Sequence, residues 1–196
     1  KNSMKKYRFA VVLLLVFLFF LTGICTATAN STQQKKIVYV VLDDSGSMNG
    51  NKWSHANYAV QVLGGLMNPG DELRIYYLSD SKVHKVDLSG KGIADSLKEI
   101  ANNRMRSGTT PFEGVNRGWE ALSNQKPEDN AVYWLVVLTD GAFDEKEMNI
   151  PENVQKQFEK FVSSGIGTSK YPVQIIYCTI GNNALRIDTS SAIKTS

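Results

Sequence analysis

Three oxygen-bearing side chains follow one another at alternate positions early in the chain. Asp43, Ser45 and Ser47 stand at i, i+2 and i+4 around Gly46. A tight turn with that spacing can direct three oxygens toward one point, and hard oxygen ligands suit a hard cation such as Mg²⁺. Because Asp and Ser are also common in ordinary capped turns, the rest of the chain must decide between a turn and a metal site.

Two further polar positions could complete such a site. Thr109 precedes a predicted helix, and Asp140 follows a second strongly apolar run. The five candidate ligands are Asp43, Ser45, Ser47, Thr109 and Asp140. They form an all-oxygen set without His or Cys, which fits Mg²⁺ or Mn²⁺, whereas Zn²⁺ normally recruits softer ligands.

The elements that must position these side chains alternate between strands and helices. The apolar runs at 36–42 and 131–138 are typical of strands buried on both faces of a parallel sheet. Each run ends in polar residues, and open α/β sheets place their sites at the carboxyl ends of strands, where the strand order reverses. We therefore expect Asp43 and Asp140 to meet at one edge of a three-layer, doubly wound, mostly parallel α/β sheet.

The other periodic segments complete this sheet and its helices. Strands are predicted at 72–78, 82–88 and 171–180, and helices at 52–67, 92–102, 110–123 and 151–164. The short turn between the strands at 72–78 and 82–88 predicts an antiparallel hairpin, which gives the sheet one antiparallel edge strand.

Two local predictions concern neighbours of the candidate ligands. Thr110, Pro111 and Glu113 fit a capping box at the start of a helix, which leaves the Thr109 hydroxyl to the metal site. Asp44 alternates away from its neighbours and is expected to be solvated or to lie behind the metal ligands.

The first 29 residues have the layout of a secretory signal peptide. Lys5, Lys6 and Arg8 precede an apolar run at 9–21, and Ala27-Thr28-Ala29 offers a cleavage site. An uncleaved membrane anchor is the alternative, but the apolar run is shorter than the roughly 20 residues that a spanning helix needs, which favours a cleaved leader. We expect a signal peptide at 1–29, a linker at 30–35 and one domain at 36–196.

Removal of this leader changes the charge argument. The whole chain has 22 basic and 19 acidic residues, and without the four basic residues of segment 1–29 the net charge falls from +3 to −1. Charge therefore gives no support for nucleic-acid binding. Cys25 would leave with the leader, so Cys178, in an apolar run, is expected to be a buried thiol without a disulfide partner.

The polar motifs resemble those of von Willebrand factor type A domains, the family that includes the integrin I domains. Asp43-Asp-Ser-Gly-Ser47 matches the D-x-S-x-S element of their metal ion-dependent adhesion site. Ser107-Gly-Thr109 is similar to the second element, and Leu138-Thr-Asp-Gly141 is similar to the third. Pro69-Gly-Asp71 and Leu78-Ser-Asp80 are similar to segments of bacterial members.

The resemblance implies a function as well as a fold. Ser45, Ser47 and Thr109 would bind the metal directly, and Asp43 and Asp140 would bind it partly through water. A Glu or Asp of a protein partner would complete the shell of Mg²⁺ or Mn²⁺. The implied protein is an adhesion-type binding module, secreted, extracellular or in the cell envelope. It would have no nucleic-acid partner and would touch a membrane only through an uncleaved leader.

The C-terminal end departs from the family pattern. Family members shift between closed and open forms by displacing their last helix, whereas this chain continues only from 182 to 196 after Gly181. We therefore expect the last helix, and with it a strand, to be incomplete. The switching mechanism stays open for this chain.

Two other functions would use the same residues. One is a subunit of a surface or envelope assembly that uses the fold structurally. The other is a Mg²⁺-dependent phosphotransferase of the haloacid dehalogenase type, with Asp43 as nucleophile. Such enzymes need a general acid two residues later, where this chain has Ser45, and neither His55 nor His84 lies near a candidate nucleophile. We therefore predict a binding module that is not an enzyme.

Overall fold

The structure is a computed structural model that describes residues 33–79, 82–102, 109–166 and 173–181. The predicted signal peptide, half of the predicted linker and the predicted incomplete C-terminal helix lie outside the described residues. So do Cys25, Asp80, Ser107 and Gly108. None of the described helices is long and apolar enough to span a bilayer.

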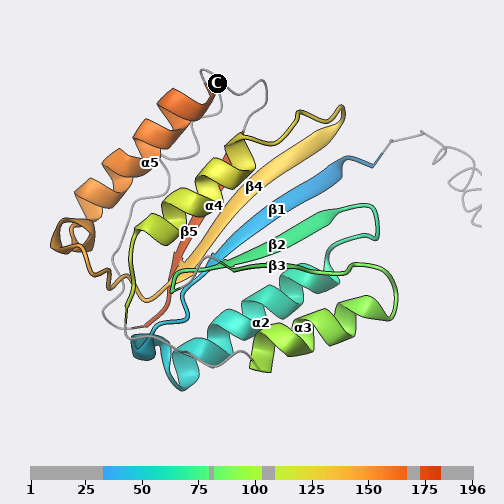
Figure 1. The fold of residues 1–196 in the computed structure, drawn as a ribbon, viewed down its shortest axis with the longest axis horizontal. Coiled ribbons are helices and arrows are strands. Elements are labelled where there is room, and N and C mark those ends of the chain that lie inside the picture. The colour runs from blue at the N-terminus through green and yellow to red at the C-terminus, as the bar shows by residue number, and fades with distance from the viewer. Residues whose placement is uncertain (1–32, 80–81, 103–108, 167–172, 182–196) are drawn as a thin grey trace, which may run out of the picture. The chain divides into compact units, whose positions relative to one another are not determined.

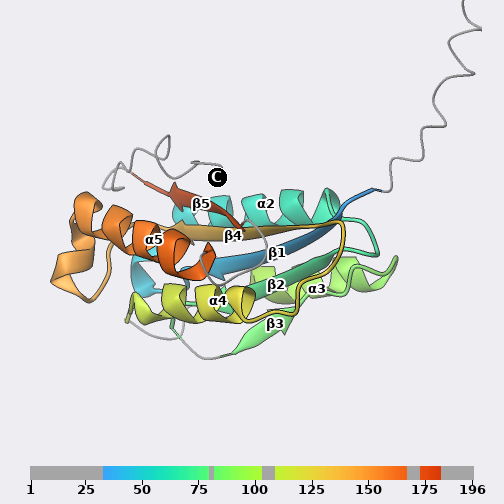
Figure 2. The same ribbon diagram turned by 90° about the horizontal axis from the view of Figure 1, so that it is seen from above.

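A five-stranded sheet forms the centre of the described part, in the order β3-β2-β1-β4-β5. Its strands are β1 (Lys35–Leu42), β2 (Glu72–Tyr77), β3 (Val83–Lys85), β4 (Ala131–Thr139) and β5 (Val173–Thr179). All neighbours pair in parallel except β3, which is antiparallel to β2. Figure 2 shows the strands following one another in this order. The predicted doubly wound, mostly parallel sheet with one antiparallel edge strand is confirmed.

Helices cover both faces of this sheet. They are α2 (Asn51–Gly65), α3 (Gly92–Asn102), α4 (Glu113–Ser123) and α5 (Pro151–Ile166), with 3₁₀ turns η1 (Gly46–Met48) and η2 (Lys146–Asn149). Helices α2 and α3 lie on one face, and α4 and α5 lie on the other (Figure 1). This is the predicted three-layer arrangement.

The central strand β1 is buried on both faces, as its unbroken apolar sequence predicts. Ile37, Tyr39 and Val41 pack in the core beneath α4 and α5. The alternate residues Val38, Val40 and Leu42 pack in the core beneath α2 and α3. The polar residues that follow Leu42 are therefore attached to the central, fully packed strand of the sheet.

The apolar edge strand β5 carries Cys178. Its thiol is free but half-buried, so the prediction of a fully buried cysteine is too strong. Partial burial raises its pKa above the ordinary thiol value.

Candidate metal centre

Strands β1 and β4 end side by side, which brings two of the predicted ligands to the same edge. Leu42 pairs with Leu138, and the next backbone N–H, that of Asp43, donates to the Leu138 carbonyl at 2.9 Å. Asp140 follows β4 directly after Thr139. We call this end of the sheet the carboxyl edge, and the opposite end the amino edge.

Asp43 is fully buried at the carboxyl edge and is held by short polar contacts. Its Oδ1 accepts from the Ser45 backbone N–H at 2.9 Å, and its Oδ2 accepts from the Thr139 hydroxyl at 2.6 Å. The Thr139 oxygen in turn accepts from the Gly141 N–H at 3.0 Å. Thr139 thus orients Asp43 from the neighbouring strand, a role that the sequence reasoning missed although Thr139 stands directly before Asp140.

The charge of Asp43 is poorly compensated. Burial raises the pKa of its carboxyl, the hydrogen bonds from Ser45 and Thr139 oppose that rise, and the charge of Asp140 adds to it. Among the described residues, no Lys, Arg or His forms an ion pair with Asp43.

The buried phenol of Tyr177 also lies in the negative field of Asp43 and Asp140. Burial raises the pKa of Tyr177 on β5, and the charges of Asp43 and Asp140 raise it further. Its hydroxyl is also buried without a hydrogen-bond partner in the described part of the chain. A cation bound between the carboxylates would offset this field.

Ser45 and Ser47 place two hydroxyls beside each other. Their Oγ atoms are 3.0 Å apart, and the 3₁₀ turn η1 begins between them at Gly46. Ser45 is buried whereas Ser47 is exposed, and Met48 at the end of the turn is fully buried. The buried Met48 side chain therefore anchors the turn in the core, and the Ser47 hydroxyl faces solvent.

Asp140 is also buried, and both of its oxygens have partners. Its Oδ1 accepts from the Ala142 N–H at 3.2 Å, and its Oδ2 accepts from the Lys52 ammonium at 2.7 Å. Lys52 is the second residue of α2. Sequence reasoning did not identify this lysine, because 88 positions separate it from Asp140 and no local motif links them.

Thr109 lies exposed in the segment before α4, which is bound to the loop that carries Asp140. The Thr110 N–H donates to Asp144 Oδ2 at 2.8 Å, and the Asp144 N–H donates to the Thr110 carbonyl at 3.0 Å. The structure thus brings Asp43, Ser45, Ser47 and Asp140 to the carboxyl edge, and it connects Thr109 to that edge through its neighbour.

The predicted capping box before α4 is wrong. The helix begins at Glu113, and no side chain of its own segment caps it. Instead the Phe112 N–H donates to Glu145 Oε2 at 2.9 Å. Acceptors from a distant loop satisfy the amides at this helix start, so Thr110 is not needed as a cap.

Of the two places expected for Asp44, the structure shows the second: the residue lies behind the candidate ligands and is not solvated. This side chain is buried and accepts from the backbone N–H of Ser79 at 2.9 Å and from the Ser79 hydroxyl. It faces away from the candidate ligands, as alternation predicts, and ties the end of β1 to the residues that follow β2. Asp44 therefore supports the loop from behind.

The donor set fits a hard cation. Among the described residues, no three His, Cys, Asp or Glu side chains gather where they could hold a metal. A metal at the carboxyl edge would therefore use hydroxyl oxygens together with Asp43 and Asp140. Hydroxyl and carboxylate oxygens are suitable ligands for Mg²⁺ and Mn²⁺.

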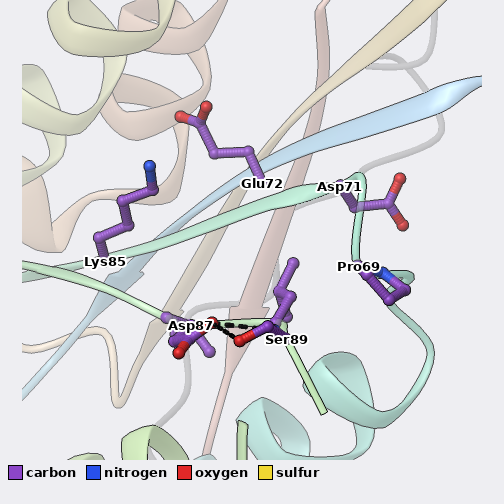
Figure 3. A pocket seen from close by; sticks show the side chains of 8 residues that line it. Pro69, Asp71, Glu72, Lys85, Asp87 and Ser89 are labelled. Carbon is purple, nitrogen blue, oxygen red and sulfur yellow. Dashed lines mark hydrogen bonds between the residues drawn. The ribbon is translucent and has the colours of Figure 1, made fainter. Parts of the chain in front are cut away.

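A separate pocket of about 390 Å³ lies at the amino edge (Figure 3). Its lining includes Asp71 and Glu72 at the start of β2, and Asp87 beyond β3. Asp71 and Glu72 already form ion pairs with Lys36 and Arg74, respectively. Asp87 accepts from the backbone N–H and hydroxyl of Ser89, and these bonds lower the pKa of its carboxyl. The acidic groups of this pocket are thus satisfied within the chain.

Comparisons with known proteins agree with this architecture. No protein-family model matches the chain, and no curated protein matches it. The solved structure of an aerotolerance-related membrane protein from Bacteroides fragilis, with multiple mutations to serines, is 16% identical with a TM-score of 0.51. The match covers 79% of this chain and 77% of that chain. The chain has the von Willebrand factor type A fold.

Other solved structures are similar at comparable identity. A conserved hypothetical protein, BatB from Bacteroides thetaiotaomicron, is 16% identical over 73% of this chain, with a TM-score of 0.49. A von Willebrand factor type A protein from Catenulispora acidiphila is 15% identical over 74%, with a TM-score of 0.48. This chain spans 65% of the length of the first and 34% of the second. At such identities, the likeness to the von Willebrand factor type A fold concerns architecture and leaves function to the site itself.

Proposed function

We propose that this chain is a divalent-metal-dependent protein-binding module of the adhesion type. The proposed ligands of Mg²⁺ or Mn²⁺ are Asp43, Ser45, Ser47, Thr109 and Asp140. One observation carries the proposal: two buried carboxylates meet at the carboxyl edge beside paired hydroxyls, and among the described residues one ammonium group forms an ion pair with them. Buried charge of one sign is costly unless it is paired, so a cation is the natural complement.

Each residue has a defined task in this proposal. Thr139 and the Ser45 amide fix both oxygens of Asp43, which holds that carboxylate at one orientation. Ser47 faces solvent and marks the side from which a partner approaches. When bound, the metal supplies an electrophilic point for a Glu or Asp of the partner protein.

The phosphotransferase alternative fits the geometry less well. Asp43 is fully buried, and both of its carboxylate oxygens are engaged, so neither is directed at an incoming phosphoryl group. His55 is exposed on α2, and His84 lies on β3 at 3.7 Å from Glu99. Neither supplies a general base beside a nucleophile at the carboxyl edge. We therefore propose binding rather than catalysis.

The location proposed for this module is outside the cell or in its envelope. The basic and apolar leader at 1–29 supports export. The Bacteroides fragilis protein with the same fold is described as a membrane protein. A structural role in a surface assembly would use the same export route and the same carboxyl edge.

The first prediction concerns thermal stability in the presence of metal. Mg²⁺ or Mn²⁺ should raise the melting temperature of the purified protein, because a ligand that binds only the folded state stabilises it by about 2.7 kcal/mol at 100 times its Kd. Asp43→Ala or Thr109→Ala should abolish the shift, measured by calorimetry with metal and with chelator.

Asp129→Ala provides the control, because Asp129 is an exposed loop carboxylate before β4 at the amino edge. This variant should keep the full metal shift. Identical melting in metal and in chelator would exclude the proposed metal site. Hydrolysis of a phosphomonoester that disappears in Asp43→Asn would instead favour the phosphotransferase.

A further inference from the structure

The ion pair between Lys52 and Asp140 is placed where a metal would compete with it. Lys52 Nζ lies 2.7 Å from Asp140 Oδ2, and the Asp140 side chain is only 4% exposed. Lys52 stands in the first turn of α2, where the helix dipole disfavours a positive charge. Its position is therefore better explained by the carboxylate it contacts than by the helix that carries it.

The side chain of Lys52 also lies close to the backbone after β5. Gly181, after β5, has φ +112°, and a Cβ built there would lie 2.9 Å from Lys52 Cε. A side chain at position 181 would therefore require the flexible end of Lys52 to shift. Lys52 thus passes close to Gly181 after β5 and reaches the loop after β4.

The charges at the carboxyl edge make this lysine relevant to a cation. Among the described residues, Asp43 and Asp140 supply two carboxylates, and Lys52 supplies one ammonium group, which forms its ion pair with Asp140. The remaining Asp140 oxygen is occupied by the Ala142 N–H. A metal that binds Asp140 must therefore share this carboxylate with Lys52 or displace the lysine.

We propose that the ammonium group of Lys52 competes with the metal for Asp140. In the metal-free protein it pairs with the Asp140 carboxylate, and it thereby weakens metal binding at this site. The inference rests on the proposed function, because it requires a metal to bind beside Asp43. It adds a role for the partner: a carboxylate from the partner protein offsets the charge of Lys52. The metal would thus bind tightly only in the complex with the partner protein. Lys52 is a positioning residue in this scheme and not a metal ligand.

The test is a Mg²⁺ titration, by calorimetry, of the unmodified protein and of Lys52→Met. Loss of the competing charge should lower the Kd for Mg²⁺ about tenfold, since one unit charge at close range is worth about that factor. Lys52→Arg keeps the charge and should bind Mg²⁺ close to the unmodified Kd. The Arg variant therefore separates the effect of the charge from the effect of side-chain packing. Lys52→Gln replaces Lys52→Met in the titration if the Met variant does not fold.

Lys36→Met is the matched control. Lys36 Nζ lies 3.0 Å from Asp71 Oδ2 at the amino edge, with side-chain exposures of 30% and 3%, against 33% and 4% for Lys52 and Asp140. Removing it should lower stability in chelator and leave the Kd for Mg²⁺ unchanged. A double-mutant cycle of Lys52→Met and Asp140→Asn in chelator should also show favourable coupling.

The outcomes separate the two proposals. If the unmodified protein does not bind Mg²⁺ or Mn²⁺ at all, the proposed function fails. If it binds and Lys52→Met leaves the Kd unchanged or raises it, the competitor role of Lys52 is overturned while the metal site stands. Absence of coupling in the double-mutant cycle would also overturn that role, because the ion pair would then not form in the metal-free protein.

Discussion

Asp43 is a carboxylate in an environment that does not favour its charge. It is fully buried, hydrogen bonds from Ser45 and Thr139 stabilise its charge, and the charge of Asp140 opposes its ionisation. The folded protein therefore binds the Asp43 proton more tightly than the unfolded chain does. In the metal-free protein, protonated Asp43 therefore contributes to the free energy of unfolding. This contribution is fully present below the ordinary pKa of 3.8 and is lost as the pH rises through the higher pKa of the folded state.

Asp43→Asn should therefore stabilise the metal-free protein at neutral pH. The gain in free energy of unfolding should be larger at pH 7 than at pH 4, because only the ionised carboxylate carries the burial cost. Urea denaturation in chelator at both pH values measures it. Asp129→Asn, at an exposed loop position, is the matched control. A gain for Asp43→Asn that is equal at both pH values would contradict the assigned electrostatics.

Local contacts at the site were readable from the sequence, and distant ones were not. Asp43, Ser45 and Ser47 lie within one turn, so their spacing limits where their oxygens can point. The partner of Asp140 is Lys52, which only the packed sheet brings near. The burial of Asp44 likewise depends on Ser79, 35 positions away.

At the level of elements, the loop after β4 supports the segment before α4. Asp144 accepts from the Thr110 N–H, and Glu145 accepts from the Phe112 N–H. These bonds join the loop that carries Asp140 to the segment that carries Thr109. The segments that carry these two proposed ligands are therefore linked by hydrogen bonds.

Asp144→Ala should weaken metal binding without touching a proposed ligand. It leaves the Thr110 N–H without its acceptor, which costs about 1–3 kcal/mol of stability. The Kd for Mg²⁺ should rise, because Thr109 is no longer held beside the site. Calorimetric titration measures the Kd of Asp144→Ala. Asp129→Ala is the control and should bind Mg²⁺ with the Kd of the unmodified protein. An unchanged Kd for Asp144→Ala would mean that this tether does not position Thr109.

Elements with strong local signals were predicted well. Helix α3 begins at Gly92 and ends at Asn102, as its apolar spacing predicts. Strand β3 is shorter than the predicted 82–88, because the chain turns where the Asp87 carboxylate accepts from Ser89. The start of α4 was misplaced for a different reason: its capping groups come from a loop that lies after β4 in the sequence.

At the level of the whole described domain, the sheet separates two polar regions. The proposed metal centre lies at the carboxyl edge, and the pocket beside Asp71 and Asp87 lies at the amino edge (Figure 3). A ligand at one edge should leave the other unchanged, since the buried residues of β1 lie between them. The amino edge is therefore an internal reference for metal effects.

Hydrogen exchange should show this separation directly. Mg²⁺ should slow amide exchange at 43–50 and at 139–145, because ordering of these loops removes local opening. Exchange at 69–72 and 85–89 should not change. Mass-spectrometric exchange with metal and with chelator measures all four segments in one experiment. Equal protection at both edges would indicate global stabilisation and not a local site.

The bond from Thr139 to Asp43 also affects the order in which the protein folds. It joins residues 96 positions apart, so it forms only after β4 has docked beside β1. Such distant pairing is slow, because a large loop must close first. A metal that needs this arrangement would bind after the rate-limiting step and could not act as a folding template. In stopped-flow experiments, Mg²⁺ should therefore slow unfolding and leave the refolding rate unchanged.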